Sequence, residues 1–159
     1  MGRTLNVKLA AGLLLLTTVQ AFGGSLPDPH LTPGAIDPTL KVAAICSTKW
    51  GKDARHVSAS MKRQVFAEYG LSGNGDPYCR PIGCEIDHLI SRELGGADEK
   101  TNLWPQSHSG QWNAHMKDRV ENRLHREICA GNVSLKAAQR GIAKDWTVLY
   151  RHYFGSPAQ

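Results

Sequence analysis

Asp87, His88 and Asn102 are the residues with the clearest chemical potential, and they lie in the stretch EIDHLISRELGGADEKTNLWPQ. A neutral imidazole accepts a proton from water near physiological pH, because histidine titrates there. A neighbouring carboxylate can hold a divalent cation, which stabilises charge on phosphoryl and leaving oxygens. An Asn amide orients the imidazole, directly or through the loop that it pins. The combination favours hydrolysis of a phosphodiester, with His88 as general base, Asp87 as metal ligand and Asn102 as orienting residue.

Strand geometry sets a condition on this assignment. Glu85 to Ile90 has strand character, and neighbouring side chains on a regular strand point to opposite faces. Asp87 and His88 can therefore act on one phosphate only where the strand twists, bulges or ends. Gly95-Gly96 forms a turn downstream, and Thr101 to Trp104 is expected to form a second short strand.

The helix after this segment is expected to complete the metal site. Apolar residues recur every fourth position from about Gln111 to Cys129, which predicts an amphipathic helix. At about 100° per residue, His115 and Asp118 share the face opposite the apolar stripe, and their i, i+3 spacing lets both reach one ion. These two are the expected helix ligands. The competing candidates are His108, Asn113 and Glu121.

Basic side chains near the proposed site are candidates for phosphate contacts. The formal charge of +5 suits a polyanionic partner, although many basic proteins bind no nucleic acid. Arg92, Lys117 and Arg119 are the expected nucleic-acid contacts. Lys62, Arg63 and Arg80 would extend this track. Such contacts give affinity without sequence specificity, and solubility is an equally good explanation for any one of them.

The segment from Glu85 to Gln106 resembles the HNH endonuclease family, through the Asp-His, Gly-Gly and Asn-Leu pieces of the ββα-metal motif. The likeness continues through Lys117-Asp-Arg-Val-Glu121 toward the C-terminal helix, as in small exported bacterial proteins, but only residues 85–106 are diagnostic. The resemblance implies a nuclease that cuts DNA, with RNA as a further substrate, through one divalent ion (Mg²⁺, Mn²⁺ or Zn²⁺). It assigns His88, Asp87 and Asn102 the roles given above. The chain departs from many relatives because its helix ligand comes later after the central Asn.

The remaining pattern predicts an α+β fold, a mainly helical domain with a short β-hairpin and a ββα-metal (HNH-like) unit. One helix is expected from Ser58 or Ser60 to Gly70, and a loop over residues 72–84. The last helix should begin at Ser134 as N-cap and close at Gly155. Its aromatic residues, with those of the preceding helix, are expected to pack in the core.

The first part of the chain predicts export. Residues 1–21 combine a basic start, an apolar run of about a dozen residues and the small side chains read by signal peptidase. An uncleaved anchor is the alternative. Residues 22–40 contain four prolines and predict a flexible lead-in, so residues 41–157 form the expected nuclease domain. The mature chain then has no membrane span and is periplasmic or secreted.

The four cysteines favour disulfides, because an even count behind an export signal is typical of an oxidising compartment. Of three pairings, Cys79–Cys84 closes a short loop and Cys46–Cys129 ties the front of the domain to a late helix. A four-cysteine zinc site is the alternative, although it would want closer-spaced pairs than this chain offers.

Two other functions stay open at this point. An isolated Asp-His pair can be a buried hydrogen-bonded pair that fixes a loop, and Asn102 can simply hold a turn. The chain would then be a non-catalytic HNH-like module that binds nucleic acid, or a structural or interaction protein of the cell envelope. The joint occurrence of the three residues in family order favours the enzyme.

Overall fold

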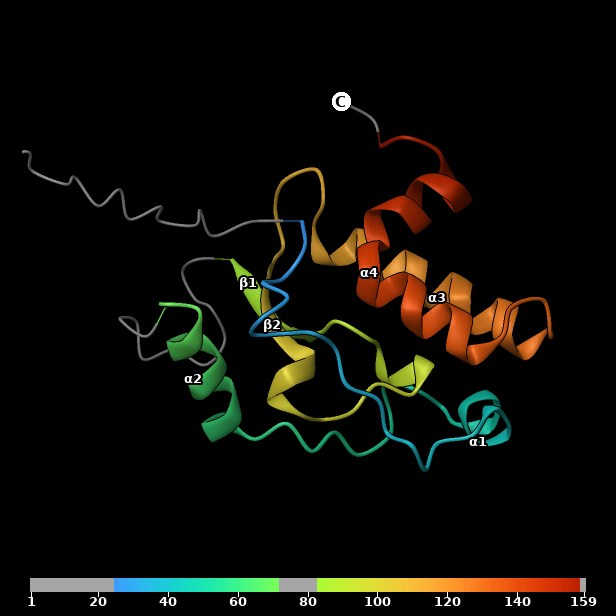
Figure 1. Ribbon diagram of the computed structural model, residues 1–159, viewed down its shortest axis with the longest axis horizontal. Coiled ribbons are helices and arrows are strands. Elements are labelled where there is room, and N and C mark those ends of the chain that lie inside the picture. Colours follow the sequence, from blue (N-terminus) through green and yellow to red (C-terminus); the bar gives the residue numbers. More distant parts are fainter. Residues whose placement is uncertain (1–24, 72–82, 158–159) are drawn as a thin grey trace, which may run out of the picture.

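The computed structural model describes residues 25–71 and 83–157 (Figure 1). Within these ranges the chain forms four α-helices and one antiparallel two-stranded hairpin, so the α+β expectation is confirmed. In chain order the elements are α1 (Val42–Ser47), α2 (Ala59–Glu68), β1 (Cys84–His88), β2 (Leu103–Ser107), α3 (Ala114–Cys129) and α4 (Leu135–Phe154). Two short 3₁₀ turns, η2 (Arg92–Leu94) and η3 (Lys100–Asn102), lie between the strands.

The helix pair α3 and α4 packs side by side and forms the larger core (Figure 1). Val120, Leu124 and Ile128 of α3 are buried against Ile142 and Trp146 of α4, because the apolar positions of both helices recur on one face. This confirms the stripes expected from the sequence.

The helix ends follow from capping side chains. Ser134 accepts a hydrogen bond from Ala137 N, which confirms it as the N-cap of α4. Of the two candidates Ser58 and Ser60, Ser58 is the N-cap of α2 and accepts a hydrogen bond from Met61 N. Helix α3 begins three residues later than expected, because Asn113 accepts a hydrogen bond from Met116 N and ends the preceding loop. Helix α4 is interrupted at Asp145, whose extended backbone (φ −169°, ψ 97°) and Oδ1 contact with Thr147 N restart the helix.

The hairpin and α2 form a smaller core of Val65, Phe66, Cys84, Ile86 and Leu103. The register pairs Asp87 with Trp104 and His88 with Leu103. The first strand ends two residues earlier, and the second lies two to three residues later, than the sequence predicts. The register sets Pro105 opposite Ile86 in this two-stranded sheet, which tolerates a residue without a backbone donor because both strands are edges.

The described part of the lead-in, residues 25–40, is here called the strap, and it differs from the flexible segment expected. Gly34 N donates to Thr101 O (2.9 Å), Asp37 N donates to Gly95 O (2.9 Å), and Ala97 N donates to the backbone oxygen of Ala35 (3.0 Å). The strap therefore runs along the loop between the strands and is held to it by backbone pairing, which proline-rich composition does not reveal.

Cys46 and Cys129 form a disulfide with a Cα–Cα distance of 5.6 Å, so this expected pairing is confirmed. It joins α1 to the end of α3. Cys79 lies outside the described residues, and its pairing with Cys84 stays a prediction. The expected signal peptide and Arg80 also lie outside them. In residues 25–71 and 83–157, no helix has the length and apolar character that a membrane crossing requires.

Candidate functional site

Asn102 pins the loop that connects the two strands. Its Oδ1 accepts a hydrogen bond from Ile90 N (2.9 Å), and its Nδ2 donates to Ile90 O (2.9 Å) and Ala97 O (3.0 Å). The side chain is fully buried. Gly96 closes the same loop, where a Cβ would lie 1.7 Å from Ile90 O, so only glycine fits. Asn102 thus fixes the loop and does not hydrogen-bond to the imidazole of His88 directly.

His88 is held by Asp98, which comes from the pinned loop. His88 Nε2 lies 2.8 Å from Asp98 Oδ1, while Asp98 Oδ2 accepts a hydrogen bond from His56 N (2.6 Å). The pKa of Asp98 is lowered, because backbone and imidazole donors outweigh the effect of burial. An ionised carboxylate only accepts hydrogen bonds, so Nε2 carries the imidazole proton and Nδ1 presents its lone pair. Arg55 Nη2 lies 3.3 Å from that Nδ1.

The environment of His88 keeps its imidazole neutral at pH 7. Burial and, to a smaller extent, the Arg55 guanidinium lower the pKa of His88 to about 4, although the Asp87 and Asp98 carboxylates act in the opposite direction. The residue is only 3% exposed. A general base must be unprotonated, as this ring is at pH 7, and a pKa closer to 7 would make it a stronger base.

Asp87 forms an ion pair with a buried lysine. Lys117 Nζ donates to Asp87 Oδ2 (2.7 Å), to His88 O (2.5 Å) and to the carboxylate of Glu121. All three ammonium hydrogens are thereby used. Burial raises the pKa of Asp87, but the Lys117 charge outweighs it and keeps that pKa below its usual range. Burial also raises the pKa of Glu121, to about 8, against the opposing effect of Lys117.

A pocket of about 470 Å³ opens beside these groups and is lined by both Asp87 and His88. The burial pattern of β1 alternates, so the two side chains leave opposite faces of the strand; they border one pocket because the strand ends at His88. Six carboxylates line this pocket: Asp53, Glu85, Asp87, Glu93, Asp118 and Glu121. Burial and neighbouring negative charge raise the pKa of Glu85 and of Asp118.

Of the two metal ligands expected on α3, one lines the pocket and the other does not. Asp118 lines the pocket, whereas His115 is largely exposed, with Nδ1 3.9 Å from Asp118 Oδ2 and its ring stacked on His108. Asn113 is the N-cap of α3.

The expected phosphate contacts also differ from one another. Arg92 lines the pocket and pairs with Asp53 and Asp98. Lys117 is fully buried and does not offer its charge to solvent. Arg119 Nη1 donates to Tyr150 OH (2.5 Å) and its guanidinium stacks on Phe154, toward α4.

Sequence reasoning did not single out Asp98 or Arg55. Asp98 lies two residues after Gly96 in the same motif, and an acid so close to a Gly-Gly turn could have been interpreted as a partner for the histidine. Arg55 comes from a segment of irregular backbone between α1 and α2, and nothing in its neighbourhood signals the contact with His88.

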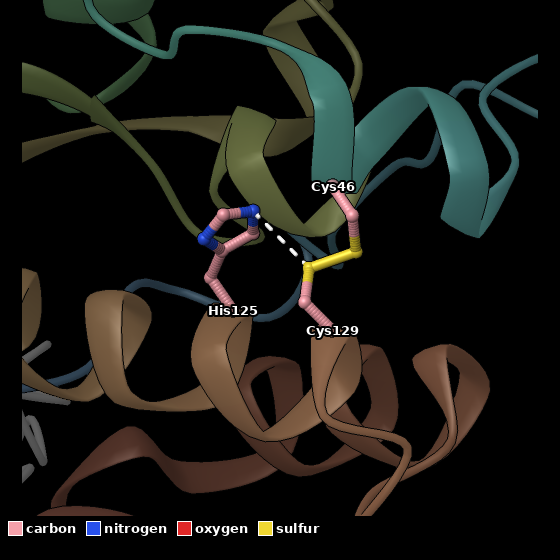
Figure 2. Close-up of side chains that lie close together, drawn as sticks. All are labelled: Cys46, His125 and Cys129. Carbon is pink, nitrogen blue, oxygen red and sulfur yellow. Dashed lines mark hydrogen bonds between the residues drawn. A yellow bond between two sulfur atoms is a disulfide. The ribbon is translucent and has the colours of Figure 1, made fainter.

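A separate group of side chains could hold a metal ion. Ligand atoms of Cys46, His125 and Cys129 all lie within 4.8 Å of one another, and Figure 2 shows them between α1 and α3. The ligands expected from the sequence, Asp87, His115 and Asp118, are not this group. In the present state the two sulfurs are bonded to each other in the disulfide.

Comparisons of the chain with protein-family models, with curated proteins and with solved structures found no match.

Proposed function

We propose that the chain is a divalent-cation-dependent endonuclease of the HNH type that hydrolyses DNA, and RNA as a further substrate. The observation that carries the proposal is the His88–Asp98 pair, in which Nε2 is bound to the carboxylate, Nδ1 contacts Arg55 and the histidine borders a carboxylate-lined pocket. The resemblance of residues 85–106 to the HNH motif supports the same reaction.

His88 takes the proton from the attacking water at Nδ1. Asp98 then stabilises the imidazolium, because its carboxylate stays ionised and bonded to Nε2. Arg55, which already contacts Nδ1, can exchange that contact for a phosphate oxygen when substrate arrives. Asn102 keeps Asp98 in place by fixing the loop that carries it.

The donor set of the pocket fits a hard cation. Carboxylate oxygens are the ligands that Mg²⁺ and Mn²⁺ prefer, and the six carboxylates would otherwise repel a phosphodiester. Asp87 and Asp118 are the proposed ligands, with Glu85 beside them; Lys117 compensates only part of this negative charge. When bound, the cation supplies charge neutralisation at the phosphate. Burial and the neighbouring Asp87 charge raise the pKa of Asp118, and Lys117, His115 and His108 offset only part of this effect.

One observation favours the alternative of binding without cutting. Lys117 occupies an oxygen of Asp87, so part of the expected metal ligand is already used. In this alternative the chain still binds nucleic acid but His88 has no chemical role.

Plasmid cleavage by the purified, folded chain tests the proposal. We expect nicking with Mg²⁺ or Mn²⁺ that stops with EDTA and falls by about 10²- to 10⁴-fold in His88→Ala, the usual contribution of a general base. His152→Ala is the matched control, because that exposed histidine lies on α4 and does not line the pocket. DNA binding is measured in parallel in the presence of the metal.

The outcomes separate the readings. Equal cutting by His88→Ala and the native chain would reject His88 as the base. If the native chain binds DNA without cutting it, the binding module is the correct function. If it neither binds nor cuts DNA, both the nuclease and the binding module are rejected.

A further inference from the structure

A second group of ligand-type side chains lies away from the acidic pocket, where α1 meets the end of α3. His125 and Cys129 stand one helical turn apart on α3, and Cys46 reaches across from α1 (Figure 2). Cys46 and Cys129 are exposed and His125 is partly exposed, so both a reductant and an ion can reach them from solvent.

The spacing between His125 and Cys129 matches the coordination of zinc. Tetrahedral Zn²⁺ binds sulfur at about 2.3 Å and imidazole nitrogen at about 2.0 Å, which places a ligand nitrogen and sulfur roughly 3.5 Å apart. The distance between His125 Nε2 and Cys129 Sγ is 3.6 Å. The pair on α3 therefore already has the separation that the metal requires, whereas the two sulfurs would have to move apart.

We propose that reduction of the Cys46–Cys129 disulfide turns this group into a zinc site formed by two thiolates and His125, with water as the fourth ligand. A dithiol reductant gives up two electrons and two protons and becomes a disulfide, while the protein disulfide becomes two thiols. Zn²⁺ binding then releases the two thiol protons to solvent. In the oxidised chain the sulfurs are bonded to each other and no thiolate is available.

Metal binding has a local cost at His125. Its Nε2 lies 3.2 Å from Ile45 O, and as a donor it would carry the ring proton there. To bind zinc through Nε2, the ring moves its proton to Nδ1 and gives up this hydrogen bond. One zinc–nitrogen bond and two zinc–thiolate bonds replace it, so the exchange is favourable once both sulfurs are reduced.

The site would keep α1 attached to α3 in the absence of the disulfide. This attachment reaches the pocket, because Trp50, Asp53 and Arg55 follow α1 in the chain and line that pocket. Disulfide and zinc are thus alternative links at one position, selected by the redox state.

Zinc binding to the full chain tests the proposal. The protein is reduced with a dithiol, desalted without oxygen and titrated with Zn²⁺ or Co²⁺ against a metal indicator, beside the oxidised protein. We expect the reduced chain to bind one additional ion at least tenfold more tightly, and Co²⁺ to give thiolate-to-metal charge-transfer absorption. His125→Ala and Cys46→Ser should each weaken binding at least tenfold. The controls His152→Ala and Cys79→Ser should not.

Equal binding by the reduced and oxidised chains, or full binding by His125→Ala, would overturn the proposal. If reduction unfolds the chain, far-ultraviolet circular dichroism provides the second readout. Recovery of the helical signal on adding Zn²⁺ would support the site, and failure to recover it would reject the site.

Discussion

Replacing Asn102 by Ala tests whether its amide holds the loop that carries Asp98. The substitution leaves Ile90 N, Ile90 O and Ala97 O without their side-chain partner, in a region where both residues are almost fully buried. An unsatisfied buried backbone group costs about 1–3 kcal/mol, so three of them predict a loss of at least about 3 kcal/mol of unfolding free energy. This loss is a large part of the unfolding free energy of a typical domain, which is about 5–15 kcal/mol.

Urea denaturation followed by circular dichroism measures this loss. Asn122→Ala is the matched control, because the exposed Asn122 donates a hydrogen bond to Asp118 O on its own helix and should change stability by about 0.5 kcal/mol or less. The variant Asn102→Asp provides a second test. The new carboxylate would face the carbonyl oxygens of Ile90 and Ala97, which would raise its pKa. This variant should become more stable as the pH falls, because the protonated carboxyl group can donate a hydrogen bond to one of these oxygens. A loss below about 1 kcal/mol for Asn102→Ala would refute the reasoning.

Three further perturbations have defined outcomes. Gly96→Ala should abolish folding or cost more than about 4 kcal/mol by thermal melting, whereas Gly131→Ala, at a positive φ in open space, should cost about 1–2 kcal/mol. The folded-state pKa of His88 is lowered from 6.5 to about 4. The neutral histidine therefore contributes fully to the free energy of unfolding above pH 6.5, and this contribution is lost as the pH falls to about 4. With EDTA present, the unfolding free energy of the native chain should fall by about 3 kcal/mol through this effect between pH 6.5 and pH 4, and His88→Gln should lack this fall. Equal pH dependence of stability in the two chains would contradict the prediction. Lys117→Met should cost about 3–5 kcal/mol in urea, because it leaves the buried, ionised Asp87 without its counter-charge. Glu121→Gln should cost much less at pH 7, since the pKa of about 8 leaves Glu121 mostly protonated; similar losses for the two variants would disprove this charge assignment.

The local features of the fold could be predicted because local side chains determine them. Ser58, Ser134 and Gly155 each mark a helix end through a contact within one turn of the chain, and the structure places the ends there. The Cys46–Cys129 pairing also followed from the sequence, because few pairings were available. Helix α1 has no capping side chain and only one buried residue, so its sequence carries little signal.

The candidate site was predictable only in part, for a physical reason. Asp87, His88 and Asn102 share one short segment, and the structure places all three around a single loop and pocket edge. The partner of Asp87 is Lys117, thirty residues away in the chain, and it was expected on the surface because buried lysines are rare. Its contacts with Asp87, with Glu121 and with the backbone oxygen of His88 explain its burial, and only the folded chain brings these groups together.

The pairing of the strap with the loop between the strands has a practical consequence for shortened versions of the chain. A version trimmed to start at Lys41, the boundary that the prolines suggest, would lose the bonds that residues 34–37 make with Gly95, Ala97 and Thr101. Thr32 also donates to Leu103 O (2.8 Å), at the first residue of β2. Such trimming would free the very loop that carries Asp98, so affinity tags and fusion partners belong before Ser25, and the proline-rich stretch should be kept whole.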